Sequence, residues 1–161
     1  MKVLKSIPSE VAALIPKTQL EFTRENLSEF SDAILRLQTR LKKCPKLFGT
    51  EKMKEHPAVF HYFLGETDIY ICEYNRKDDM FGYSILNGDL DCSEWGYISL
   101  PEITGISFLN IDYYFKEQTI EAALYGKYPD YFPKPQSLFT FKAILTKLIN
   151  KIKRCFSSGK H

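Results

Sequence analysis

The chain has 161 residues, 44% of them hydrophobic and 26% charged, which is typical of one soluble globular domain and excludes disorder throughout its length. Its formal net charge of +2 conceals an acidic middle segment: residues 1–64 carry 11 Lys/Arg and 7 Asp/Glu, residues 65–121 carry 3 and 12, and residues 122–161 carry 8 and 1. No stretch approaches the roughly 18 continuous apolar residues of a membrane span, and the four cysteines form neither a metal-binding nor a disulfide pattern, so we expect a cytoplasmic protein with reduced thiols.

Two helices are predicted in the N-terminal part, residues 1–55. The first is short and ends at Pro16. The second spans 27–43, where apolar residues recur at spacings of three and four with charged residues between them. Asn26 and Glu29 resemble the capping box that begins such a helix. The predicted apolar stripe consists of Leu27, Phe30, Ile34, Leu37 and Leu41.

The pattern changes to strands in residues 56–116. Four segments rich in Val, Ile, Tyr and Phe are separated by short polar links that contain Gly, Asn or Asp, and a fifth segment follows Pro101. Short links join antiparallel neighbours, so we predict an antiparallel meander of about five strands. The predicted strands are Ala58–Leu64, Thr67–Tyr74, Met80–Leu86, Glu94–Leu100 and Leu109–Phe115.

Two further helices, joined by a linker, are predicted after the sheet. The first occupies 117–125, and the prolines and tyrosines of 126–135 exclude regular structure in the linker. The second, at 139–156, is amphipathic with a basic face, and residues 157–161 are expected to fray. We therefore predict a single α+β domain in which the helix at 27–43 and the basic C-terminal helix cover the sheet.

The acidic segment 87–94 alternates oxygen-bearing side chains, as loops that bind Ca²⁺ or Mg²⁺ do. Its glycine and glutamate do not occupy the positions that an EF-hand requires. We therefore interpret this segment as a solvated acidic turn, and we predict neither a metal nor another cofactor.

Cys72 and His61 are the candidate residues for nucleophilic catalysis. Catalysis would require the thiol and the imidazole within hydrogen-bond reach in a pocket. A core histidine beside a buried thiol explains the same residues, and a regular strand would point His56 and His61 to opposite faces. The chain has no nucleophile elbow and no phosphate-binding glycine loop. We expect binding rather than catalysis, and a Cys–His hydrolase stays an alternative.

Two surfaces are candidates for binding. Carboxylates held on a sheet, together with its tyrosines, are suited to a basic protein or nucleoprotein partner. The candidate acidic face consists of Asp78, Asp79, Asp89, Asp91 and Glu94. The basic C-terminal helix favours single-stranded nucleic acid instead. Its candidate residues are Lys142, Lys147, Lys151, Lys153 and Arg154. Ordinary roles stay open for both surfaces, since acids also serve solubility and a basic helix also covers a sheet.

Strand motifs follow one another in a fixed order between His56 and Phe115. They are Glu73-Tyr74, Phe81-Gly82-Tyr83, Gly96–Leu100 and Asp112–Phe115. In this order they resemble a group of short proteins that conjugative plasmids, transposons and phages carry and whose shared domain has no assigned function. The resemblance implies an accessory protein of a mobile genetic element that acts on host defences or on transfer machinery. Our leading expectation is a non-enzymatic inhibitor of a host defence nuclease, such as a CRISPR effector.

Overall fold

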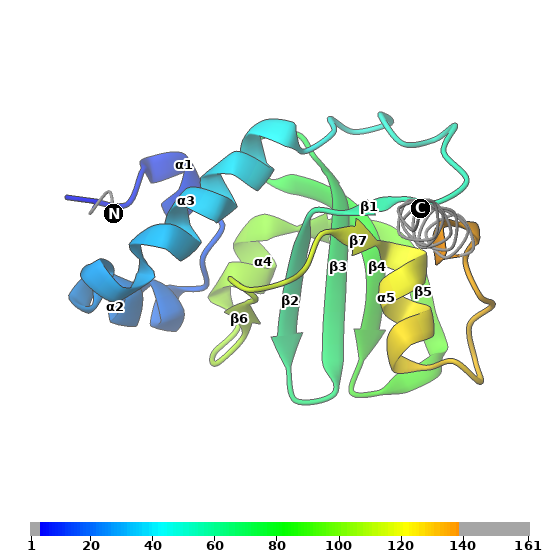
Figure 1. Cartoon of the computed structure of the whole chain (residues 1–161). Coiled ribbons are helices and arrows are strands. Elements are labelled where there is room, and N and C mark those ends of the chain that lie inside the picture. Colours follow the sequence, from blue (N-terminus) through cyan, green and yellow to red (C-terminus); the bar gives the residue numbers. More distant parts are fainter. Residues whose placement is uncertain (1–3, 139–161) are drawn as a thin grey trace, which may run out of the picture. The chain divides into compact units, whose positions relative to one another are not determined.

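The computed structural model describes residues 4–138 (Figure 1). The chain divides into two compact units, Met1–Ile120 and Glu121–His161. The first unit holds four helices and all of the strands of the described chain. No helix in this described part is long and apolar enough to cross a membrane.

Three helices precede the sheet: α1 (Ser9–Ala12), α2 (Lys17–Glu25) and α3 (Leu27–Lys43). α3 confirms the helix predicted at 27–43, and its apolar stripe packs into the core of the first unit. α2 is not among the predicted helices. α1 corresponds to the short helix predicted before Pro16, although it ends earlier, at Ala12. Pro16 is the N-cap of α2, a place where its missing amide hydrogen is no loss.

The capping box predicted at the start of α3 is wrong. Asn26 precedes the helix, but its side chain makes no hydrogen bond to the first amides of α3. Its Nδ2 donates instead to the carbonyl oxygen of Phe22, at 2.9 Å. The backbone amide of Asn26 donates to the same carbonyl oxygen at 3.2 Å, so Asn26 closes the end of α2 rather than capping the start of α3.

Five strands form one antiparallel sheet in the order β5-β4-β3-β2-β6, which confirms the predicted α+β meander (Figure 1). The strands are β2 (Phe60–Leu64), β3 (Thr67–Tyr74), β4 (Asp79–Leu86), β5 (Asp89–Ser99) and β6 (Asn110–Ile111). β1 (Pro57–Ala58) and β7 (Gln118–Thr119) pair with each other in a separate two-stranded sheet.

β6 is shorter than the strand predicted at Leu109–Phe115. The chain turns at Asp112, whose Oδ1 accepts a hydrogen bond from the amide of Tyr114 at 2.9 Å. A side chain that binds the backbone two residues later forms a local turn and ends the strand.

β5 begins earlier than predicted because Asn87 and Gly88 form a two-residue hairpin. Their φ angles are 54° and 72°, and Leu86 pairs with Asp89 directly beyond them. A hairpin with both central residues in the left-handed region matches the twist of the strands. Most of the segment 87–94, expected as a solvated turn, is therefore strand.

The sheet has two unlike faces. The first packs in the core with the N-terminal helices and includes Phe60, Tyr62, Ile69 and Ile71. Directly paired residues on neighbouring strands share a face. Two rows on the opposite face are therefore set by register: His61, Tyr70, Tyr83 and Trp95 in one, and Glu73, Phe81 and Tyr97 in the other. This opposite face is mainly aromatic.

Two short helices lie after β5 in the described part of the chain. α4 (Leu100–Gly105) follows β5, and α5 (Ile120–Lys127) corresponds to the helix predicted at 117–125. In the second unit the amide of Phe132 donates to the carbonyl oxygen of Tyr128 at 3.1 Å. The helix predicted at 139–156 lies outside the described residues.

Candidate functional site

A cleft of about 510 Å³ opens on the aromatic face of the sheet, and its volume falls in the range of roughly 300–1,000 Å³ typical of ligand sites. Four of its lining residues come from strands: Glu73, Phe81, Trp95 and Tyr97. The other four come from the segment between α3 and β1: Phe48, Thr50, Glu51 and His56. We call this the aromatic cleft. It was not predicted, because it joins a loop to strands that follow it in sequence.

The walls of the aromatic cleft are flat rings held against one another. Trp95 stacks on Phe81 with 6.0 Å between ring centroids and 18° between planes. The His56 ring lies 4.5 Å from Trp95, and the Tyr97 ring meets Phe81 edge-on at 5.3 Å. Phe48 and Tyr97 are 63% and 62% exposed. The cleft therefore presents aromatic surface to a ligand.

Glu73 brings a negative charge into this aromatic site although it is only 3% exposed. Its Oε2 accepts a hydrogen bond from the amide of Phe48 at 2.7 Å. Its Oε1 accepts from the amide and from the hydroxyl of Thr50, at 2.7 and 2.5 Å. Within residues 4–138 no lysine or arginine forms an ion pair with this carboxylate. Hydrogen-bond donors thus stabilise the Glu73 carboxylate, and none of the described lysines and arginines neutralises it.

The same carboxylate holds Phe48 in an unfavourable backbone conformation. Phe48 has a φ of 67°, in the left-handed region that residues other than glycine rarely adopt. Its amide is one of the donors to Glu73, so that bond stabilises the conformation. Strain retained in this way is typical of functional loops.

The candidate acidic residues are all exposed, but the structure separates them into two groups. On the paired strands β4 and β5, Asp79 lies opposite Ser99, and Leu86 lies opposite Asp89. Asp79 and Asp89 are therefore at opposite ends of this pair, roughly 23 Å apart at about 3.3 Å per residue. Asp78 lies with Asp79. The second group lies on the edge strand, and we call its members the β5 acids: Asp89, Asp91 and Glu94.

One of the β5 acids, Asp89, is stabilised as a carboxylate by a local hydrogen bond. Asp89 Oδ1 accepts a hydrogen bond from the amide of Cys92 at 3.1 Å, and this contact lowers the pKa of Asp89 below its ordinary value. In the part of the chain that the structure describes, neither Asp89 nor Glu94 forms an ion pair with a lysine or arginine. These carboxylates are therefore presented to solvent rather than neutralised by those described cations.

Most of the tyrosines of the sheet are not available for contact. Tyr62, Tyr70, Tyr74 and Tyr83 are buried. Tyr97 is the exposed tyrosine of β5. The expected Tyr-rich surface is therefore reduced, beside the β5 acids, to one exposed tyrosine at the aromatic cleft.

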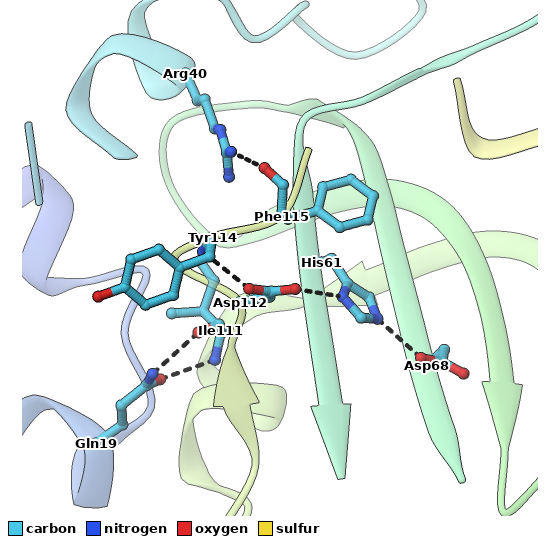
Figure 2. A network of polar contacts seen from close by, with 8 residues as sticks. All are labelled: Gln19, Arg40, His61, Asp68, Ile111, Asp112, Tyr114 and Phe115. Carbon is cyan, nitrogen blue, oxygen red and sulfur yellow. Dashed lines mark hydrogen bonds and ion pairs between the residues drawn. The ribbon is translucent and has the colours of Figure 1, made fainter. Parts of the chain in front are cut away.

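A second polar cluster surrounds His61 (Figure 2). His61 Nε2 lies 2.8 Å from Asp68 Oδ1, and Nδ1 lies 3.5 Å from Asp112 Oδ2. The ring stacks on Tyr70 at 4.6 Å, and only 12% of the side chain is exposed. His61 is thus held between two carboxylates and connects β2 and β3 with the turn after β6.

Neighbouring contacts in Figure 2 attach that turn to the N-terminal helices. The side-chain amide of Gln19 donates to the carbonyl oxygen of Ile111 at 3.0 Å and accepts from the Ile111 amide at 2.8 Å. The guanidinium of Arg40 donates to the carbonyl oxygen of Phe115. These contacts support the fold, and we assign the cluster a structural role.

Among residues 4–138, Cys72 and His61 do not form the arrangement that a Cys–His hydrolase requires. Cys72 is buried, and its thiol donates to the carbonyl oxygen of Phe81 at 3.4 Å. No hydrogen bond joins Cys72 to His61 among residues 4–138. The described chain also holds no group of three His, Cys, Asp or Glu side chains placed to bind a metal ion.

The candidate nucleic-acid-binding residues remain a prediction. Lys142, Lys147, Lys151, Lys153 and Arg154 lie outside the described residues. Comparison of the chain with family models, curated proteins and solved structures finds no match. The geometry of the aromatic cleft and of the β5 acids therefore provides the basis for a functional assignment.

Proposed function

We propose that this protein is a non-enzymatic binding protein that docks on the basic surface of a protein or nucleoprotein partner through the β5 acids and the aromatic cleft. One observation carries the proposal: the edge strand β5 bears exposed carboxylates and also contributes Trp95 and Tyr97 to the cleft. By register Glu94 pairs with Ser84, on the face opposite to Trp95 and Tyr97, so a partner that contacts both must grip the β5 edge of the sheet. Exposed aromatic side chains and complementary charge are both typical of protein interfaces.

The position of β5 at the edge of the sheet gives its acids a second possible role. Charged side chains on an edge strand prevent pairing with another copy of the chain. Lysine protects an edge as well as aspartate does, but it reverses the charge that a basic partner would meet. Substitution by lysine therefore separates protection of the edge from recognition of a partner.

The resemblance of the strand motifs to accessory proteins of mobile elements supports a particular class of partner. We propose that the partner belongs to the host's defence or to the transfer machinery, and that a defence nuclease such as a CRISPR effector is the first to test. Nucleases and their nucleoprotein complexes carry basic surfaces that hold nucleic acid, and an acidic surface is complementary to them.

Charge reversal on β5 tests the proposal. We expect Asp91→Lys combined with Glu94→Lys to reduce partner capture at least tenfold at low salt, with a smaller difference at high salt because ions screen the attraction. Asp89 is left unchanged because it accepts a hydrogen bond from the amide of Cys92. The measurement is quantitative affinity capture from nuclease-treated lysate of the cells that make the protein, with thermal melting of each variant.

The matched control reverses two exposed acids of α2, Glu21→Lys with Glu25→Lys, and changes the net charge by the same amount. Equal losses in both double variants, or no loss from the β5 pair, would contradict the proposal. Capture that nuclease treatment abolishes, and that truncation after Gln136 also abolishes, would favour the nucleic-acid-binding alternative.

A further inference from the structure

The aromatic cleft has a charge as well as a shape. Two of its lining residues, Glu51 and Glu73, are carboxylates, and no lysine or arginine is among the eight that line it. Donors from Phe48 and Thr50 satisfy the hydrogen-bonding capacity of Glu73 but leave its net charge in place. A charge in a poorly solvated site interacts strongly with an opposite charge nearby. An anion would be repelled here and a cation attracted.

The rings that form the cleft favour a cation for a second, independent reason. The face of an aromatic ring is electronegative, and among the side chains indole binds cations best. Trp95 is partly exposed at the cleft and contacts the rings of Phe81 and His56. A neutral apolar ligand would use the rings but would gain nothing from the two carboxylates.

We infer that the aromatic cleft receives an arginine side chain of the partner, with its guanidinium against the ring of Trp95 and facing the carboxylates of Glu51 and Glu73. This inference deepens the proposed function and rests on it for the source of the arginine.

Arginine fits these walls better than lysine. Its guanidinium is planar, stacks on aromatic rings and is more weakly hydrated than an ammonium group, so less water must be removed when it enters. Stacked pairs such as Trp95 and Phe81 offer a flat surface of the matching kind. The N–H groups at the edge of the guanidinium remain available to carboxylate oxygens.

The loop that carries Phe48 provides further support. The left-handed backbone conformation of Phe48 and the exposure of its ring are both unfavourable in the isolated protein. The hydrogen bond from the Phe48 amide to Glu73 stabilises this conformation. The carboxylate that charges the cleft therefore also holds an aromatic side chain at its rim. Both features are useful to a site that encloses a cationic side chain.

Trp95 is the only tryptophan of the chain, so its fluorescence reports directly on the aromatic cleft. The experiment titrates the full-length protein with Nα-acetyl-arginine amide and follows this emission. We expect a saturable change, at least tenfold weaker binding of the neutral isostere Nα-acetyl-citrulline amide, and several-fold weaker binding of Nα-acetyl-lysine amide. Equal responses to arginine and citrulline, tighter binding of lysine, or no saturable response would each overturn the inference.

Two variants connect the response to the lining residues. Glu51→Gln removes an exposed carboxylate, and Tyr97→Ala removes an exposed ring, so neither is expected to prevent folding. Each should weaken the arginine response at least threefold. Tyr114→Ala removes a tyrosine that is also exposed but does not line the cleft, and it should leave the response unchanged. An unchanged response in both Glu51→Gln and Tyr97→Ala would overturn the inference.

The fluorescence experiment tests the inference, and the capture experiment tests the proposed function, so a negative result in one does not imply a negative result in the other. If no arginine response is seen but the Asp91/Glu94 charge reversal still abolishes capture, the inference is wrong and the proposed function stands. If arginine binds at Trp95 but charge reversal leaves capture unchanged, the proposed function is wrong and, with it, the assignment of the arginine to a protein partner.

Discussion

Replacement of Gly82 by alanine is expected to destabilise the protein by about 3 kcal/mol or more, which is at the upper end of typical overpacking effects. A Cβ at this position would lie 1.9 Å from the carbonyl oxygen of Tyr70 and 3.0 Å from the Cα of Ile71. Both are backbone atoms of β3, so no side-chain rotation relieves the clash. β3 and β4 would have to separate beside the register shift between Ile71 and Glu73.

The matched control is Gly96→Ala. Gly96 pairs directly with Gly82 across β4 and β5, yet a Cβ built there meets no atom within 4 Å. Alanine in a strand is favoured over glycine by roughly 0.5–1 kcal/mol, so this variant should be neutral or slightly stabilised. Denaturant unfolding followed by circular dichroism compares the two. Equal effects on the free energy of unfolding would show that the close approach of β3 and β4 is not as described.

Replacement of Glu73 by alanine is expected to have the second large effect. It removes the acceptor for the amides of Phe48 and Thr50 and for the Thr50 hydroxyl. A buried donor left without a partner costs about 1–3 kcal/mol, so we expect a total loss of roughly 3 kcal/mol or more. Hydrogen exchange should locate the effect, with protection lost first at the amides of Phe48 and Thr50.

Glu51→Ala is the control for Glu73→Ala, because Glu51 is an exposed carboxylate of the same cleft. Its free energy of unfolding should change by less than about 0.5 kcal/mol. If Glu73→Ala were no more destabilising than Glu51→Ala, or if both loop amides stayed protected, Glu73 would not be the support of this loop.

Elements with local signals were predictable from the sequence. The Asn87-Gly88 turn, the spacing of apolar residues in α3 and the strand-forming runs all act through contacts within a few residues. They suffice for an antiparallel sheet with a helix before it, and the structure has both.

Elements that depend on distant contacts were missed or misplaced. α2 is polar, and what fixes it is tertiary: Thr23 shares a hydrogen bond with Tyr113 at 2.8 Å, and Gln19 binds the backbone of Ile111. α4 has a local signal, since Ser99 precedes Glu102 by three residues and its Oγ accepts from the Glu102 amide at 3.4 Å.

The candidate site was harder to predict because it combines segments that are far apart in sequence. His56 lies against Trp95 and His61 against Tyr70, on the same face of the sheet, whereas one regular strand would have placed them on opposite faces. The chain leaves strand geometry between β1 and β2, which changes the alternation. One signal was available: Glu73 is the only charged residue in the otherwise apolar end of β3.

The most direct test of the partner-binding surface is site-specific photo-crosslinking with a photoreactive phenylalanine analogue at position 97 or at position 114. Tyr97 lies at the aromatic cleft, and Tyr114 is exposed elsewhere in the first unit. We predict that the analogue at position 97 crosslinks to a protein partner in nuclease-treated lysate and that the analogue at position 114 does not. Crosslinking from position 114 but not from position 97, in samples that capture the partner equally well, would contradict the account.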